Sequence, residues 1–100
     1  MSKNRSKANT KQVKQQLFLQ CGRVDMYNME KYAKCKLELH HDPPYSVTHH
    51  TVYDESYLLS ADNHRELHYL EKYNLNEYNK RMDIIRENKK ILEKKRTREI

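Results

Sequence analysis

The sequence predicts an α+β fold in which a short β-hairpin and a following helix lie between an N-terminal helix and a long C-terminal helix. Three observations support this prediction. Residues 36–41 alternate apolar and polar side chains, as a half-buried strand does. Residues 56–59 form a second short strand-like run, and apolar residues then recur at helical spacing from residue 61 onward. The chain has 100 residues, which is enough for one core and leaves no room for a second.

The N-terminal third is predicted to contain a single short helix. Residues 1–9 have nothing to bury, so they are expected to form a flexible basic arm. Thr10 is a candidate cap for a helix that runs to about Gln20, and Gly22 follows its end. Residues 25–36 contain tyrosines and methionines without a clean period, and they are assigned to neither helix nor strand.

The hairpin and its helix have clear boundaries in the sequence. Pro43-Pro44 ends the first strand, because proline supplies no N–H to a ladder. A long polar loop over residues 42–56 leads to the second strand. Ser60 is a good N-cap for a helix from Ala61 to about Tyr73.

A further helix is expected from about Asn76 to Arg96, with a narrow apolar stripe. The expected organisation is therefore a basic arm over 1–9, a central domain over 10–74 and a basic helix over 75–100. The chain has one phenylalanine and no tryptophan, so tyrosines are expected in the core, together with one buried thiol. These expected core residues are Tyr57, Tyr69, Tyr73 and Cys35.

Charge is distributed unevenly along the chain. Residues 1–24 carry six Lys and Arg and no acid, and residues 75–100 carry nine against five. Residues 25–74 carry five against nine. Two basic ends around an acidic middle suit a polyanionic partner, although Lys-rich ends also serve simply to keep a small domain soluble. The candidate nucleic-acid contacts at the C-terminal end, which is otherwise a solvated helix end, are Lys89, Lys90, Lys94, Lys95 and Arg96.

Composition excludes several function classes. The single glycine, Gly22, rules out both the glycine-rich dinucleotide fingerprint and the phosphate loop. No apolar run exceeds three residues, so we expect neither a transmembrane helix nor a signal peptide, and we expect a cytoplasmic protein without a membrane partner. Cys21 and Cys35 make no disulfide framework, and reduced thiols are expected.

Four histidines form the candidate site. His64 and His68 have the i,i+4 spacing that places two imidazoles on one helix face, a common arrangement for a transition-metal site. His40 and His41 are adjacent at a strand end, and a regular strand would point them to opposite faces. Because the prolines end the strand there, both rings are expected to turn toward one pocket, one binding metal and one facing water. The alternative is four ordinary surface histidines.

These segments resemble the HNH nucleases, which have the ββα-metal fold. The resemblance covers about half of the chain, roughly Cys21–Tyr73. The matching residues are Leu37-Glu38-Leu39-His40-His41, Pro44 and Ser46, Tyr53-Asp54-Glu55 leading into Leu58-Leu59, and His64-Arg65-Glu66-Leu67-His68.

The resemblance implies an endonuclease that hydrolyses DNA in a bacterial or phage-infected cell. His40, His64 and His68 would bind one divalent cation (Mg, Mn, Ni or Zn), and His41 would be the general base for the attacking water. Arg65 is a candidate phosphate clamp, or else an ordinary solvated residue next to a glutamate. So small a domain would need weak sequence preference, a homodimer or a partner protein to act on DNA selectively.

Two departures from the family pattern keep another function open. Glu55 stands where the family has an asparagine, either orienting His41 as a carboxylate partner or marking a lost activity. Three of the four positions that hold zinc-binding cysteines in many members are not cysteine here, and Phe18 is expected to pack inside instead. The four positions are Phe18, Cys21, Ser60 and Asn63. The alternative function is a catalytically inactive HNH-like binding protein, such as a small phage-type inhibitor or regulator.

Overall fold

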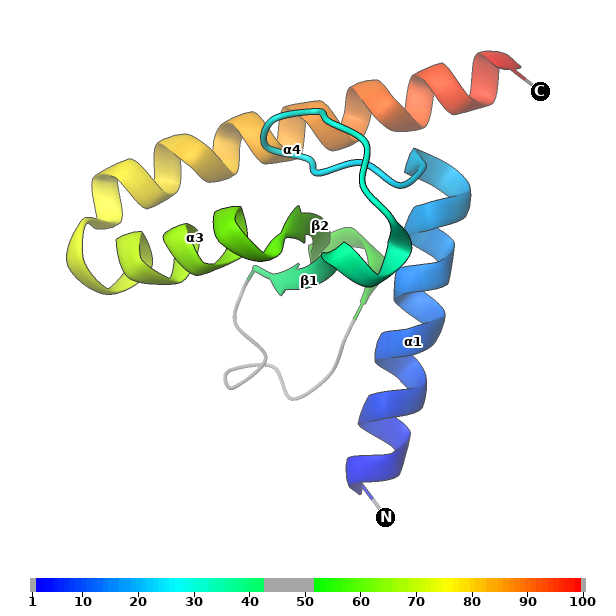
Figure 1. The fold of residues 1–100 in the computed structure, drawn as a ribbon, viewed down its shortest axis with the longest axis horizontal. Coiled ribbons are helices and arrows are strands. Elements are labelled where there is room, and N and C mark those ends of the chain that lie inside the picture. Colours follow the sequence, from blue (N-terminus) through cyan, green and yellow to red (C-terminus); the bar gives the residue numbers. More distant parts are fainter. Residues whose placement is uncertain (1, 43–51, 100) are drawn as a thin grey trace.

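The structure is a computed structural model that describes the backbone of residues 2–42 and 52–99 and the side chains of residues 10–42 and 52–95. It is a mixed α+β fold, as the sequence predicts, with three α-helices and one two-stranded antiparallel sheet in the described part (Figure 1). The elements in chain order are α1 (Ser2–Cys21), the 3-10 turn η1 (Lys34–Lys36), β1 (Leu37–His41), η2 (Tyr53–Glu55), β2 (Ser56–Ser60), α3 (Ala61–Tyr73) and α4 (Leu75–Glu99).

The hairpin is confirmed at both strands. β1 and β2 pair along their full length, from Leu37 opposite Ser60 to His41 opposite Ser56. Every residue of β2 is buried, because α1, α3 and α4 all contact this strand. The two strands therefore form the centre of the domain, and α3 leaves directly from the end of β2 (Figure 1).

One hydrophobic core joins the sheet to all three helices. Its helical members recur at intervals of three and four residues, so each helix turns one narrow stripe toward the strands. Helices α1 and α3 each pack against α4, all three helices contact β2, and α3 also contacts β1. The core residues are Val13, Leu17 and Cys21 of α1, Met26, Leu37 of β1, Tyr57, Leu58 and Leu59 of β2, Leu67 and Leu70 of α3, and Tyr78, Met82 and Ile85 of α4.

Helix α3 begins and ends where the sequence predicts. The Ser60 Oγ accepts a hydrogen bond from the Asn63 N–H at 3.4 Å, which satisfies one of the free donors of the first turn. The helix closes at Tyr73, and the Asn74 N–H donates to the Leu70 carbonyl at 2.7 Å. Capping fixes where the helix begins relative to β2, and hence which α3 residues face β1.

The two outer helices are longer than expected. α1 begins at Ser2 instead of near Thr10, so the structure makes residues 2–9 helical and not a flexible arm. α4 begins at Leu75 and runs to Glu99. The sequence gives little sign of these extensions, because residues 2–9 and 97–99 contain almost no apolar residues and so show no helical period.

Three of the expected core residues are instead exposed. Tyr69 and Tyr73 have 58% and 65% of their surface exposed, and their rings pack on each other at 4.9 Å on the outer side of α3. Cys35 is exposed in η1, before the strand enters the core. The buried face of α3 consists of Leu67 and Leu70 alone among its residues, so both tyrosines lie on the exposed face. Tyr57 is buried, as expected.

A buried carboxylate organises the segment that the sequence leaves unassigned. Asp25 is fully buried, and its Oδ1 accepts from the N–H groups of Tyr27 and Asn28 at 2.7 and 3.1 Å. Its Oδ2 accepts from the Ser60 N–H at 2.8 Å and from the Asn63 Nδ2 at 2.9 Å. Four donors to one carboxylate tie this turn to the start of α3, since a buried charge requires such satisfaction.

The four positions compared with zinc-binding cysteines are therefore part of the core and of this carboxylate cluster. Ser60 and Asn63 both donate to Asp25. Phe18 packs partly buried against the core, as expected, and Cys21 is buried with its Sγ 3.9 Å from the Tyr53 hydroxyl.

Candidate metal centre

Three histidines from two elements converge on one point. His40 lies near the end of β1, and His64 and His68 lie one turn apart on α3. Each offers a ring nitrogen, and these nitrogens lie within 4.8 Å of one another. The ring centroids of His40 are 5.4 Å from His64 and 5.6 Å from His68. The sequence spacing thus predicts the helical pair, and the hairpin brings the third imidazole to it.

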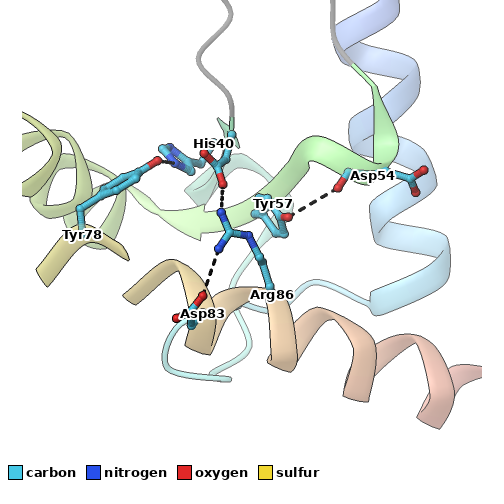
Figure 2. Close-up of polar contacts among 7 residues, drawn as sticks. His40, Asp54, Tyr57, Tyr78, Asp83 and Arg86 are labelled. Atoms are coloured by element: carbon cyan, nitrogen blue, oxygen red, sulfur yellow. Dashed lines mark hydrogen bonds and ion pairs between the residues drawn. The ribbon is translucent and has the colours of Figure 1, made fainter. Parts of the chain in front are cut away.

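His40 is the buried member of the cluster. Its Nε2 lies 3.0 Å from the hydroxyl of Tyr78 on α4, and Figure 2 shows the ring turned toward that tyrosine. Its Nδ1 is buried and has no hydrogen-bond partner among the residues that the structure describes. Burial, together with the charges of His64, His68, His41 and Arg86 in that order, lowers the pKa of His40 to about 3. The ring is therefore neutral at physiological pH, which is the form that binds a metal.

His64 is oriented by a carboxylate from β1. Its Nδ1 lies 2.8 Å from the Oε1 of Glu38, which precedes His40 by two residues and so lies on the same side of the strand. Its Nε2 is 3.0 Å from the Nε2 of His68. A carboxylate on the far nitrogen of a histidine is the usual support for a metal-binding imidazole, because it fixes the tautomer and the ring orientation.

The three side chains fit a divalent transition metal. A tetrahedral ion with metal–nitrogen distances near 2.0–2.1 Å places its ligands about 3.3 Å apart, so the His64 and His68 nitrogens need to move only slightly. The unpartnered Nδ1 of His40 has no other use in the described structure, and a metal would satisfy it. His40 is buried, His64 half-buried and His68 exposed, so the cluster opens to solvent on one side. Within the described residues, no other group of three His, Cys, Asp or Glu comes this close.

His41 follows the buried ligand and is half-buried. Regular pairing continues through His41, which lies opposite Ser56. The sequence predicts instead that the strand is interrupted by Pro43-Pro44 at this point, so that the rings of His40 and His41 turn toward one pocket. The prolines and the histidines at 49 and 50 lie outside the described residues. Burial, and then the charge of His64, lower the pKa of His41 below its ordinary value of 6.5. His41 is therefore neutral at pH 7 and able to accept a proton.

Glu55 acts on the His41 segment through the main chain. It ends η2 with its side chain partly exposed, and its carbonyl accepts the Asp42 N–H at 2.9 Å. That hydrogen bond holds the residue after His41 against the start of β2. The main-chain carbonyl thus supplies a link that does not depend on which side chain stands at position 55.

Helix α4 also holds the strand end. Arg86 donates to the carboxylate of Asp42. It also donates, at 3.2 Å, to the Oδ1 of Asp83, as drawn in Figure 2. The Tyr57 hydroxyl lies beside this group, 3.5 Å from the Asp54 carbonyl. With Tyr78, this gives α4 two separate contacts to the His40–Asp42 segment, which the sequence did not reveal because the partners are far apart along the chain.

The candidate DNA contacts divide into surface and core residues. Arg65 is exposed on α3 with the Oδ1 of Asp62 at 4.0 Å, and the side chains of Lys90, Lys94 and Lys95 are exposed on α4. The side chain of Arg96 lies outside the described part.

Lys89, which the sequence predicts as a nucleic-acid contact, is buried instead. It is only 6% exposed, its Nζ donates to the carbonyls of Tyr53 and Ser56, and it lies 4.2 and 4.8 Å from the ring centroids of Tyr53 and Tyr57. Burial lowers its pKa. Lys89 therefore binds η2 and β2 internally and presents no charge to a nucleic acid. A lysine on the buried stripe of α4, four residues after Ile85, is the sequence signal that could have revealed this.

The comparisons with known proteins identify no relative. No protein-family model, no curated protein and no solved structure matches the chain at a significant level. Within the described residues, no helix has both the length and the apolar character needed to cross a bilayer. We therefore infer the function from the geometry of the site.

Proposed function

We propose that this protein is a metal-dependent endonuclease of the HNH type that hydrolyses phosphodiester bonds in DNA. The single observation that carries the proposal is the convergence of His40, His64 and His68, with His41 adjoining on the same strand. A scaffold without metal chemistry has no physical reason to bury an imidazole with one nitrogen unsatisfied.

The histidines divide into ligands and base. His40, His64 and His68 would hold one divalent cation, and Tyr78 and Glu38 orient two of these rings. When bound, the cation supplies Lewis-acid stabilisation of the negative charge that develops on the phosphate oxygens.

His41 would take the proton of the attacking water. Its lowered pKa keeps the imidazole neutral at pH 7, so a ring nitrogen can accept a proton as the water oxygen bonds to phosphorus. The bond between phosphorus and the leaving sugar oxygen breaks in the same displacement, and that oxygen takes a proton from solvent. The hydrogen bond between Asp42 and Glu55 and the ion pair between Asp42 and Arg86 fix the backbone after His41. A base held in place in this way gains from orientation as well as from its proton affinity.

Cations on the surface would bind the substrate backbone. Arg65 follows the first helix ligand directly and is 80% exposed, which suits it to a phosphate near the site. Lys90, Lys94 and Lys95 add charge along α4. Such contacts give affinity that depends on salt and carries no sequence choice, so selective cutting would require a dimer or a partner protein.

Plasmid nicking tests the proposal. We expect the protein to convert supercoiled plasmid to nicked or linear DNA in Mg²⁺, Mn²⁺, Ni²⁺ or Zn²⁺, and we expect chelator to stop the reaction. His41→Ala should abolish cutting while metal still binds, whereas Tyr69→Ala, an exposed change on α3, should leave it unchanged. Clean protein that binds DNA and cuts it in none of these metals would overturn the nuclease assignment.

A second candidate function follows from Glu55. Here the family has an asparagine, and an ionised glutamate cannot donate a hydrogen bond from its side chain. The chain would then be an HNH-like binding protein without catalysis, such as an inhibitor or regulator. Glu55→Asn separates the two functions, because a gain of cutting would identify Glu55 as the disabling change, and a loss would make it part of the active site.

A further inference from the structure

A broad groove lies away from the histidines. It is formed by the C-terminal half of α1, the segment 22–34 and the C-terminal half of α4, which come together at one end of the domain (Figure 1). None of the cluster histidines lines it. Its volume of about 1250 Å³ exceeds the roughly 300–1,000 Å³ of small-molecule sites. The dimensions suit a segment of another macromolecule.

Several large apolar side chains line the groove. They include Leu19 of α1, Met29 of the segment 22–34 and Ile91 of α4, which have 68%, 38% and 47% of their surface exposed. Phe18 and Leu92 also line it and pack partly buried against the core. Large apolar side chains gathered in one concave surface mark an interaction site, because single exposed ones are ordinary but a group is not.

The described lining of the groove is also cationic and includes no acidic residue. Four exposed cations line it, and none of them makes an ion pair with another residue that the structure describes. The Nζ of Lys34 lies 5.6 Å from the centroid of the Phe18 ring. The Nζ of Lys14, which is outside the groove, lies 5.9 Å from it, so two positive charges lie near this ring. The four lining cations are Arg23, Lys31, Lys34 and Lys95.

We propose that this groove binds an acidic amphipathic helix of a partner protein. The apolar face of such a helix would cover Leu19, Met29 and Ile91, and flanking carboxylates would meet the cations. Charge complementarity of this kind directs encounter and excludes basic segments. The two aromatic lining residues, Phe18 and Tyr32, are half-buried against the core and offer no open platform for a base, whereas Leu19, Met29 and Ile91 are exposed, so the lining favours a protein over a nucleic acid. The groove shares Lys95 with the proposed DNA contacts, but it contains none of the metal-site histidines and its binding needs no metal.

Peptide binding tests the groove directly. The probe is a fluorescent peptide of about 18 residues, five helical turns, with leucines on one face and glutamates on the other. The controls are a scrambled peptide of the same composition and a version with lysine for glutamate. Fluorescence anisotropy in chelator should show binding of the acidic amphipathic peptide at least about tenfold tighter than either control, as expected where burial and charge act together.

Two matched pairs of variants locate the binding. Ile91→Glu should weaken it about tenfold or more, as loss of a buried anchor does, whereas Ile84→Glu, equally exposed on α4 but outside the groove, should change it less than about twofold. Charge reversal of Lys31 and Lys34 together should weaken it similarly, and reversal of Lys72 and Lys80 should not. Circular dichroism verifies that each variant is folded.

Several results would overturn the proposal. These are equal binding of the scrambled peptide, equal effects of Ile84→Glu and Ile91→Glu, or self-association of the protein that the peptide does not reduce. A short DNA duplex that binds in a way sensitive to Lys31 and Lys34 but not to Ile91 would assign the groove to nucleic acid instead. Because none of these assays measures cutting, failure here leaves the nuclease proposal intact, and the reverse also holds.

Discussion

The contact between Tyr78 and His40 leads to a sharp prediction about metal affinity. The tyrosine hydroxyl is 3.0 Å from Nε2, and the ring centroids are 6.0 Å apart in an edge-on arrangement. If His40 ligates through its unpartnered Nδ1, the proton must be on Nε2, where it donates to the Tyr78 oxygen. Tyr78 of α4 thereby selects the His40 tautomer that binds metal, although the ligands themselves lie on β1 and α3.

Tyr78→Phe keeps the ring and removes only the acceptor. The loss of a buried hydrogen bond is worth about 0.5–1.5 kcal/mol, and each 1.4 kcal/mol corresponds to a factor of ten in binding. Removing the partner of a metal-binding histidine typically costs about 10–100-fold in affinity. We therefore expect Zn²⁺ to bind Tyr78→Phe about tenfold more weakly than it binds the unchanged protein.

Competition with a chromophoric chelator measures the Zn²⁺ affinity without requiring activity. Tyr69→Phe is the matched control, because Tyr69 is an exposed tyrosine on the helix that carries two of the ligands. The Zn²⁺ affinity of Tyr69→Phe should match that of the unchanged protein within about twofold, which is well below the roughly tenfold loss expected for Tyr78→Phe. Equal affinity for Tyr78→Phe and the unchanged protein would refute the role of Tyr78 and the assignment of Nδ1 as the ligand.

Three further predictions concern stability and DNA binding. Asp25→Ala removes a buried carboxylate that accepts four hydrogen bonds, and it should lower the free energy of unfolding in urea by about 3–5 kcal/mol. Asp62→Ala, on the exposed first turn of α3, should cost less than about 1 kcal/mol, and comparable losses would contradict the role of Asp25. Lys89→Met should lower the free energy of unfolding by about 2 kcal/mol and leave the DNA affinity unchanged. Lys94→Ala should instead reduce the slope of log DNA affinity against log salt concentration by about one. A changed slope for Lys89→Met would place the charge of Lys89 at the surface. Folding lowers the pKa of His40 from 6.5 to about 3, so the unfolded chain binds more protons than the folded chain between these pH values. The free energy of unfolding of the metal-free protein should therefore decrease as the pH is lowered below about 6.5, by about 2 kcal/mol at pH 5. His40→Gln should reduce this pH dependence, and an unchanged dependence would count against a buried neutral imidazole.

The parts of the fold that local chemistry determines could be predicted from the sequence. The alternation in β1 and the cap at Ser60 fixed the hairpin and the start of α3, and the spacing of His64 and His68 placed both on one face. These signals lie within a few residues of one another, so they do not depend on how distant segments pack.

What could not be predicted depends on contacts between distant segments. Asp25 meets Ser60 and Asn63 only after the chain folds back, and its carboxylate gives no periodic signal. Tyr78 and Arg86 reach the end of β1 from α4, across separations that pattern analysis does not treat. Composition alone suggested that tyrosines fill the core, but the narrow buried face of α3 left Tyr69 and Tyr73 outside.

Native mass spectrometry of the metal-loaded protein tests most directly whether three imidazoles share one ion. The account predicts that the unchanged protein retains one Zn²⁺ or Ni²⁺ per chain after removal of excess metal, and that His64→Ala and His40→Ala each lose it, while His41→Ala retains it. Retention of the ion by His64→Ala and His40→Ala, or its loss in His41→Ala, would contradict this division between three ligands and one base.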